Sequence, residues 1–179
     1  MSFQTAMQTE TIFDGYLCEI CGQFHAGQYI SLACDCPDPY TCLTENEKSR
    51  AYLGTDDCVI DDEHYVRGII ELPIVGLDVP FLWGVWGRVW KKDYDEFLEY
   101  YAFQGREQTI GPYKSRLCNR LPGYDLRTSN LKCTIKIQSL GKRPLFLIEE
   151  PEHPLAVEQR NGISLQRART ISALVRHKL

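Results

Sequence analysis

The sequence predicts an α+β fold: a mainly antiparallel sheet flanked by short helices, with a zinc-knuckle-like N-terminal segment. Residues 131–138 read LKCTIKIQ and alternate apolar with polar side chains, as a strand with one buried and one solvated face does. Thr44 and Asp93 are each followed three residues later by glutamate, a spacing typical of helix N-termini. Cys18 and Cys21 are separated by two residues and followed by glycine, which is typical of a metal-binding knuckle.

Length and composition favour one compact domain. The chain has 179 residues, of which 44% are hydrophobic and 25% charged, so it can bury a core without disulfides. We expect residues 1–12 to form a flexible tail and residues 13–179 to form a single domain. The apolar runs are shorter than the roughly 20 residues that span a bilayer, and the N-terminus does not resemble a secretory signal. We therefore expect a cytoplasmic protein whose cysteines are ligands or packing residues rather than disulfides.

The elements of the first half follow from local patterns. Residues 28–33 predict a short strand. Thr44 then opens a helix that ends near the glycine at position 54. Residues 58–75 predict two strands, with the acidic cluster 61–63 as the turn and a β-branched run over 66–75 as the second strand.

The second half continues with strands and two helices. Residues 81–90 alternate as a strand with both faces partly covered, and Asp93 opens a helix with an aromatic stripe. The strand over 131–138 is expected to pair with residues 143–150 across a glycine turn. Ser164 is expected to cap a last amphipathic helix.

The cysteine pair near the N-terminus is the strongest candidate site. Two thiolates on a tight turn can both reach one tetrahedral ion, and His25 supplies a third ligand. A closed zinc site needs four ligands, and the residues that could complete it are Cys34, Cys36, Cys58 and His64. A redox pair is expected where a helix follows a strand, which this stretch does not offer, and reduced packing thiols are the other alternative.

Three further groups have a structural and a functional interpretation. His153 lies among acids and could transfer protons, but a histidine before proline is more typical of a loop residue with a local hydrogen bond. The acidic cluster Asp61, Asp62 and Glu63 could bind a cation or a partner, although a charged turn is usually only solvated. Trp83, Trp86 and Trp90 could form a binding platform, although packing in the core or on a sheet face is the more frequent role of tryptophan; Trp86 and Trp90 are the expected interface anchors.

Charge is distributed unevenly along the sequence. Residues 1–100 contain 18 acidic and 6 basic residues, a net charge of 6 − 18 = −12, whereas residues 101–179 contain 6 acidic and 14 basic residues, a net charge of 14 − 6 = +8. The two halves either neutralise each other across a shared sheet or leave an acidic face suited to a basic partner.

Several stretches, taken in order, resemble a known bacterial family. They are CEICGQFH, DDCVIDDEHYVRG, FLWGVWGRV, LPGYDLRTSNLK and GKRPLFLIEEPEHPLAVEQRNGIS, and they resemble the uncharacterised family called domain of unknown function 2199. The resemblance covers nearly the whole chain from about Tyr16 and implies no established activity. It implies that the metal ligands are Cys18, Cys21, His25 and Cys58, because Cys34 and Cys36 lie where the family is usually apolar.

Two classes of function remain, with a third ranked last. The first is a small binding protein with a structural zinc, most concretely an immunity-type inhibitor that covers the active site of a basic toxin domain. Its expected contact residues are Asp61, Asp62, Glu63, Trp86 and Trp90. The second is a metal-dependent enzyme in which the zinc keeps an open position and His64 or His153 assists. Nucleic-acid contact through the basic second half ranks last, because no reader motif is present.

Overall fold

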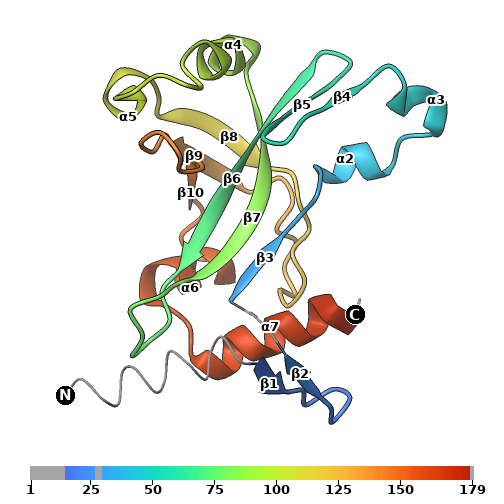
Figure 1. The fold of residues 1–179 in the computed structure, drawn as a ribbon, viewed down its shortest axis with the longest axis vertical. Coiled ribbons are helices and arrows are strands. Elements are labelled where there is room, and N and C mark those ends of the chain that lie inside the picture. The colour runs from blue at the N-terminus through green and yellow to red at the C-terminus, as the bar shows by residue number, and fades with distance from the viewer. Residues whose placement is uncertain (1–14, 27–29, 178–179) are drawn as a thin grey trace.

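The computed structural model describes residues 15–26 and 30–177, and it confirms the α+β class (Figure 1). The predicted tail, residues 1–12, lies outside the described residues. Within these residues, no helix combines the length and the apolar character needed to cross a membrane.

Five strands close into a small barrel, which the sequence patterns did not predict. They are β6 (Glu63–Leu72), β7 (Phe81–Val89), β8 (Tyr113–Leu117), β9 (Lys132–Lys136) and β10 (Leu145–Ile148). Successive strands pair antiparallel from β6 to β10, and β10 returns to pair parallel with β6 (Figure 1). The pairing of β9 with β10 confirms the hairpin expected from the alternating pattern.

Shorter strands extend the barrel sheet at two places. β5 (Asp57–Ile60) pairs with the first half of β6, and β4 (Tyr52–Leu53) pairs with β5. β3 (Ser31–Ala33) pairs parallel with the first half of β7. A separate hairpin is formed by β1 (Gly15–Leu17) and β2 (Phe24–Ala26).

Two glycines allow the barrel core to pack around one aromatic ring. Phe146 of β10 is fully buried, and a Cβ atom at Gly68 or Gly87 would lie 2.5 or 2.3 Å from that ring. Such distances are shorter than van der Waals contact, so the ring occupies space that any larger residue at these two positions would need.

The tryptophans of β7 lie on opposite faces, as the alternation predicts. Trp83 belongs to the main core, whereas Trp86 lies in a second apolar cluster. The buried members of that second cluster are Cys58, Ile60, Tyr65 and Trp86. Both faces of β7 are therefore covered.

The helices of the described residues are mostly short. They are α2 (Asp38–Thr41), α3 (Glu45–Lys48), α4 (Lys91–Glu99), α5 (Arg106–Thr109), α6 (Pro154–Asn161) and α7 (Leu165–His177). The capping residue Thr44 is confirmed, since its hydroxyl accepts the Glu47 N–H while the Glu47 carboxylate accepts the Thr44 N–H. The predicted end of this helix near position 54 is wrong, because α3 ends at Lys48 and residues 52–53 form β4. Ser164 likewise accepts the N–H of Arg167 at the start of α7.

One predicted helix start is wrong. α4 begins at Lys91 rather than at Asp93, with Trp90 in the N-cap position and no side chain capping it. The carbonyl of Trp90 accepts the N–H groups of Asp93 and Tyr94, so the chain turns helical directly where β7 ends. The glutamate spacing that suggested Asp93 is therefore inside the helix.

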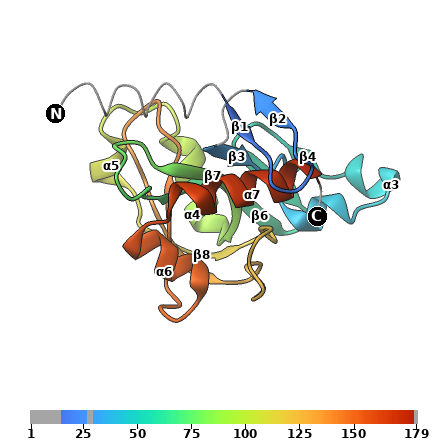
Figure 2. The same ribbon diagram turned by 90° about the horizontal axis from the view of Figure 1, so that it is seen from below.

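The last helix connects the barrel to the β1–β2 hairpin. Ala168 and Ile171 of α7 are buried in the main core. Figure 2 shows α7 crossing beneath the barrel strands with the hairpin alongside it. Side chains of both elements, including Tyr16 and Ala173, line one small surface hollow, so the hairpin packs directly on α7.

Candidate metal centre

A tight turn positions the two cysteines of the knuckle. The N–H of Gly22 donates to the carbonyl of Cys18 at 2.8 Å, and the N–H of Cys18 donates to the carbonyl of Gln23 at 2.9 Å. Gly22 has a φ of +68°, in the left-handed region that glycine adopts without strain. The glycine after the second cysteine therefore permits the turn that links β1 to β2.

The hairpin register brings a histidine to the same turn. His25 of β2 pairs with Tyr16 of β1, and their ring centroids lie 5.7 Å apart. Nε2 of His25 lies 3.2 Å from the sulfur of Cys21. Cys18, Cys21 and His25, all expected from the sequence, are thus brought together.

The fourth member of the group comes from the other end of the fold. His177, in the last turn of α7, places Nε2 at 3.4 Å from the sulfur of Cys18 and its ring 5.5 Å from that of His25. The ligand atoms of Cys18, Cys21, His25 and His177 all lie within 4.8 Å of one another, and the group could hold a metal ion.

The spacing of these atoms can be compared with zinc coordination. Zn–S bonds of about 2.3 Å and Zn–N bonds of about 2.0–2.1 Å in a tetrahedron place sulfur about 3.5 Å from nitrogen. The two sulfur–nitrogen distances, 3.2 Å for Cys21 with His25 and 3.4 Å for Cys18 with His177, are close to this value. Little rearrangement is needed for one ion to contact both pairs.

The electrostatic environment favours a thiolate at the buried ligand. Burial raises the pKa of Cys18, but hydrogen bonds from the backbone N–H groups of Cys21 and Ile20 and from the His177 ring outweigh it and lower the pKa to about 6. A thiolate is the form of cysteine that binds metal. The knuckle therefore stabilises the ligand form of Cys18 through its own backbone.

Cys58, the fourth ligand expected from the sequence, is not part of this group. Its side chain on β5 is fully buried beside Tyr65 and Trp86, and burial raises the pKa of its thiol to about 12. Cys34 packs against the same apolar cluster, and burial likewise raises its pKa to about 12. These thiols are held in their neutral form in an apolar environment, where thiolate ligands are disfavoured.

The remaining candidate ligands also lie elsewhere. Cys36 is half-buried just before α2, and burial raises the pKa of its thiol. His64 on β6 packs its ring 4.9 Å from that of Tyr94. Among the described residues, the metal group includes neither of them.

The helical spacing of α7 contains a signal that His177 lies beside the hairpin. Gln166, Thr170 and Ala173 of α7 line the hollow shared with the hairpin, and His177 continues this series by four residues. Positions three or four residues apart share one face of a helix. The helix face that packs on the hairpin therefore extends to His177.

His153, the candidate proton-transfer residue, has a local structural role. It is the N-cap of α6, and its Nδ1 accepts the N–H of Leu155 at 3.1 Å. The interpretation as a loop residue with a local hydrogen bond is confirmed.

Of the five residues expected to meet a partner, four are exposed and one is buried. Asp61 and Asp62 form the exposed turn between β5 and β6. Trp90 is 71% exposed, whereas Trp86 is fully buried. The expectation that Trp86 contacts a partner is therefore wrong, and this side chain packs in the second apolar cluster instead. Glu63 is exposed and pairs with Arg88 at 3.0 Å.

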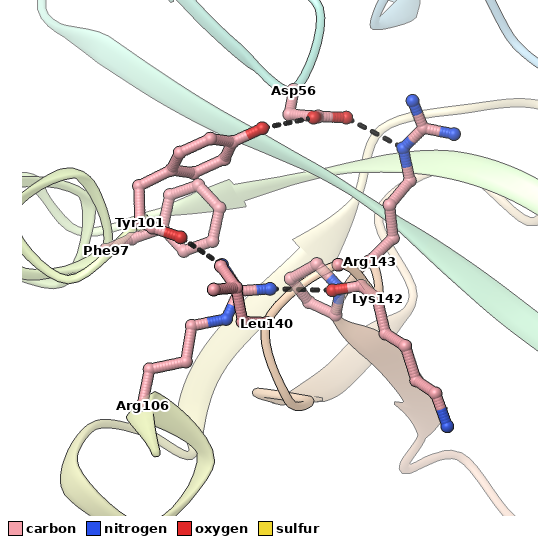
Figure 3. A pocket seen from close by; sticks show the side chains of 9 residues that line it. Asp56, Phe97, Tyr101, Arg106, Leu140, Lys142 and Arg143 are labelled. Carbon is pink, nitrogen blue, oxygen red and sulfur yellow. Dashed lines mark hydrogen bonds and ion pairs between the residues drawn. The ribbon is translucent and has the colours of Figure 1, made fainter. Parts of the chain in front are cut away.

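A separate hollow of about 420 Å³ lies between α4, α5 and the loop before β10 (Figure 3). Asp56 accepts hydrogen bonds from the Tyr101 hydroxyl and from Nε of Arg143, each at 2.7 Å. Arg106 is 4% exposed and donates to the carbonyls of Tyr101, Gln138 and Lys142. Figure 3 shows these groups facing one another, so the polar side chains of the hollow tie three segments together.

Comparisons with known proteins identify one family. A model described as "Uncharacterized protein conserved in bacteria (DUF2199)" matches residues 17–163. The match contains the two cysteines and His25, and it ends before His177. No curated protein and no solved structure matches the chain.

Proposed function

We propose that this chain, which belongs to the bacterial DUF2199 family, is a binding protein with a structural zinc site and acts as an immunity-type inhibitor of a toxin domain. The observation that carries the zinc assignment is the group of four ligand atoms from the knuckle and α7. Two cysteines and two histidines match zinc, which accepts both sulfur and nitrogen ligands in tetrahedral sites.

The number of protein ligands supports a structural role for the ion. Catalytic zinc sites usually have three protein ligands and keep the fourth position for water or substrate. The group offers four ligand atoms, and an ion bound by all four would have no open position, which supports a structural rather than a catalytic role. The alternative, a metal-dependent enzyme, would require one of these four residues to leave the ion.

Metal analysis tests the zinc site directly. Protein purified without chelators is expected to contain one zinc per chain, and removal of the metal is expected to lower the melting temperature. Cys21→Ser should lose the metal, whereas Cys42→Ser is a matched control, because Cys42 is an exposed thiol outside the group. A chain without bound metal, or equal zinc content in both variants, would contradict the proposal.

The partner-binding part of the proposal is supported by the surface around the β5–β6 turn. Asp61 and Asp62 are exposed there, and α4 packs beside this hairpin, since Tyr94 donates to Asp57 at 2.7 Å. Exposed apolar side chains lie on or beside α4; they are Trp90, Leu98, Tyr101 and Phe103. We call these residues together with Asp61 and Asp62 the acidic-aromatic surface.

Such a surface suits a basic protein partner. Aromatic residues are frequent anchors of interfaces, and complementary charge accelerates association. On α4 the exposed Glu99 adds to the negative charge, whereas Asp95 is neutralised by its ion pair with Lys91. A toxin domain with a basic active-site cleft is the partner that this combination fits best.

Co-expression tests the inhibitor proposal. The chain should co-purify with the C-terminal domain of a large toxin encoded beside its gene and should abolish that domain's toxicity. Asp61→Lys combined with Asp62→Lys should slow association about tenfold or more at low salt. Asp78→Lys is a matched control, because Asp78 is exposed at the opposite end of the β6–β7 hairpin. Failure to co-purify, or equal effects of both changes, would contradict the proposal.

A further inference from the structure

The outer face of the barrel carries a row of cations on three adjacent strands. Arg88 of β7 pairs with Arg116 of β8, and Arg116 pairs with Lys132 of β9. Paired residues project to the same side of a sheet, and neighbouring strands lie about 4.8 Å apart. We call these three residues the cation row. Like charges placed directly opposite each other destabilise a sheet, so the row has an energetic cost in the free protein.

The charge of the row is only partly compensated. Arg88 forms an ion pair with Glu63 at 3.0 Å. Arg116 donates to the carbonyl of Asn130 at 3.1 Å, and within residues 15–26 and 30–177 no carboxylate lies within 4.0 Å of the charged groups of Arg116 or Lys132.

The nearest acids are engaged by other groups. Glu149 accepts from Lys114 at 2.5 Å and from the hydroxyl of Thr134. Glu150 accepts the backbone N–H of Lys132 at 2.9 Å, which leaves the ammonium group of that lysine without an ion pair among the described residues. The charge of Lys132 is therefore partly offset by Glu149, whereas the guanidinium of Arg116 is the less compensated cation of the row.

Two surface hollows flank the row and share its arginines. One, of about 480 Å³, is lined by Arg88 and Arg116 together with Trp90, Lys91 and Lys114. The other, of about 320 Å³, is lined by the same two arginines and by residues of the loop before β9; those include Arg127, Ser129 and Asn130. Asp62 and Glu63 also line the first hollow and Asp38 the second, so cations outnumber acids in both. Lys132 lines a different hollow, together with Glu149, Glu150 and Glu152.

An exposed aromatic side chain lies beside the cations. Trp90 is 71% exposed and shares the first hollow with Lys114 and Arg116. Positive grooves with an aromatic side chain on which a base can stack are typical of surfaces that bind single-stranded nucleic acid. A duplex offers no unpaired base that could stack on Trp90. An acidic peptide has no base at all, so its binding would not depend on this side chain.

We propose that the outer face of β7, β8 and β9 binds single-stranded nucleic acid, with the cation row contacting phosphates and Trp90 stacking on a base. The cation row lies outside the acidic-aromatic surface, whereas Trp90 belongs to that surface and also lines the first hollow, so the row variant is the one that separates this inference from the inhibitor proposal. The phosphates supply the negative charge that no described carboxylate supplies within 4.0 Å of the Arg116 guanidinium.

Fluorescence anisotropy with labelled dT20 and rU20 tests the proposal on the full chain. We expect binding at 50 mM salt that weakens steeply at 200 mM. Arg116→Ala combined with Lys132→Ala should weaken binding at least about tenfold and reduce the slope of log K against log salt by about 1.4, since each phosphate contact contributes about 0.7 for single strands. Trp90→Ala should weaken binding by about tenfold with the slope unchanged.

A matched control and a stability measurement separate binding from folding. Lys136→Ala should bind as the unaltered chain does, because Lys136 is exposed on β9 but lies outside the row and both hollows. Arg116→Ala and Lys132→Ala should keep or raise the melting temperature, because each removes a repulsive cross-strand pair.

Three results would overturn the inference. The first is no binding of either oligonucleotide at 50 mM salt. The second is equal binding by the row variant and the Lys136→Ala control. The third is tighter binding of a duplex or of a poly-glutamate peptide than of the single strands, which would assign the face to a different partner. Because the Arg116→Ala and Lys132→Ala changes leave every residue of the acidic-aromatic surface unaltered, loss of nucleic-acid binding in the row variant leaves the co-purification test intact.

Discussion

The sulfur of Cys18 and Nε2 of His177 lie 3.4 Å apart, although 159 residues separate them in the chain. The contact joins the knuckle to the last turn of a helix whose Ala168 and Ile171 belong to the main core. A metal bound here would stabilise the docking of the hairpin on α7 and not only the knuckle itself.

His177→Ala is expected to lower zinc affinity at least about 100-fold, since even the loss of residues that only support a ligand costs 10- to 100-fold. Competition with a chromophoric chelator measures the affinity. His64→Ala is the control, because His64 is a histidine outside the group. Unchanged affinity of His177→Ala would show that α7 contributes no ligand.

Cys58→Ala should retain the metal. Its thiol is fully buried in the second apolar cluster, so the expected effect is a loss of about 1 kcal/mol of unfolding free energy through a small cavity. Urea unfolding and zinc content should be measured on the same sample. Loss of zinc with unchanged stability would restore Cys58 as a ligand.

Gly87→Ala should destabilise the barrel. The added Cβ would lie 2.3 Å from the ring of Phe146 and 2.5 Å from the hydroxyl of Ser115. We expect a loss of about 1–3 kcal/mol in urea unfolding. Phe146→Leu in the same chain should recover part of this loss, and a double-mutant cycle without coupling between the two positions would disprove the contact.

Asp56→Asn should reduce stability at neutral pH and have less effect in acid. Burial raises the pKa of Asp56, but the hydrogen bond from Tyr101 and the pairing with Arg143 lower it below its usual value. A carboxyl with a depressed folded pKa contributes stability that is complete above its unfolded pKa of about 3.9 and is lost as pH falls through the folded value.

The measurement for Asp56 is thermal unfolding at pH 7 and at pH 2. We expect the variant to be less stable by about 1–2 kcal/mol at pH 7, with the difference shrinking at pH 2. Asp78→Asn, at an exposed acid in the β6–β7 loop, is the control. A difference that does not change with pH would assign the loss to packing instead.

Local elements were the most predictable part of the fold. The alternation of residues 131–138, the capping box at Thr44 and the cap at Ser164 each depend on neighbours within a few positions, and each is confirmed. The helix start at Asp93 was wrong because the same spacing also occurs inside a helix that begins after Trp90. Local spacing does not distinguish these two cases.

Barrel closure and the fourth member of the metal group could not be predicted in the same way. The parallel pairing of β10 with β6 joins Leu145 to Ile69, and no local pattern encodes that register. His177 likewise meets the knuckle only because α7 crosses beneath the barrel. The three knuckle residues were found because eight consecutive residues contain them.

The distance along the chain between the knuckle and α7 sets an order of events during synthesis. His25 is made 152 residues before His177, which at bacterial translation rates corresponds to about 8–30 s. During that interval the nascent chain has two thiols and one imidazole but lacks the second imidazole. For the proposed zinc site, we expect this incomplete set to be the form of the protein most exposed to oxidants and to capture of soft metals such as Cu(I), until the final helix supplies His177.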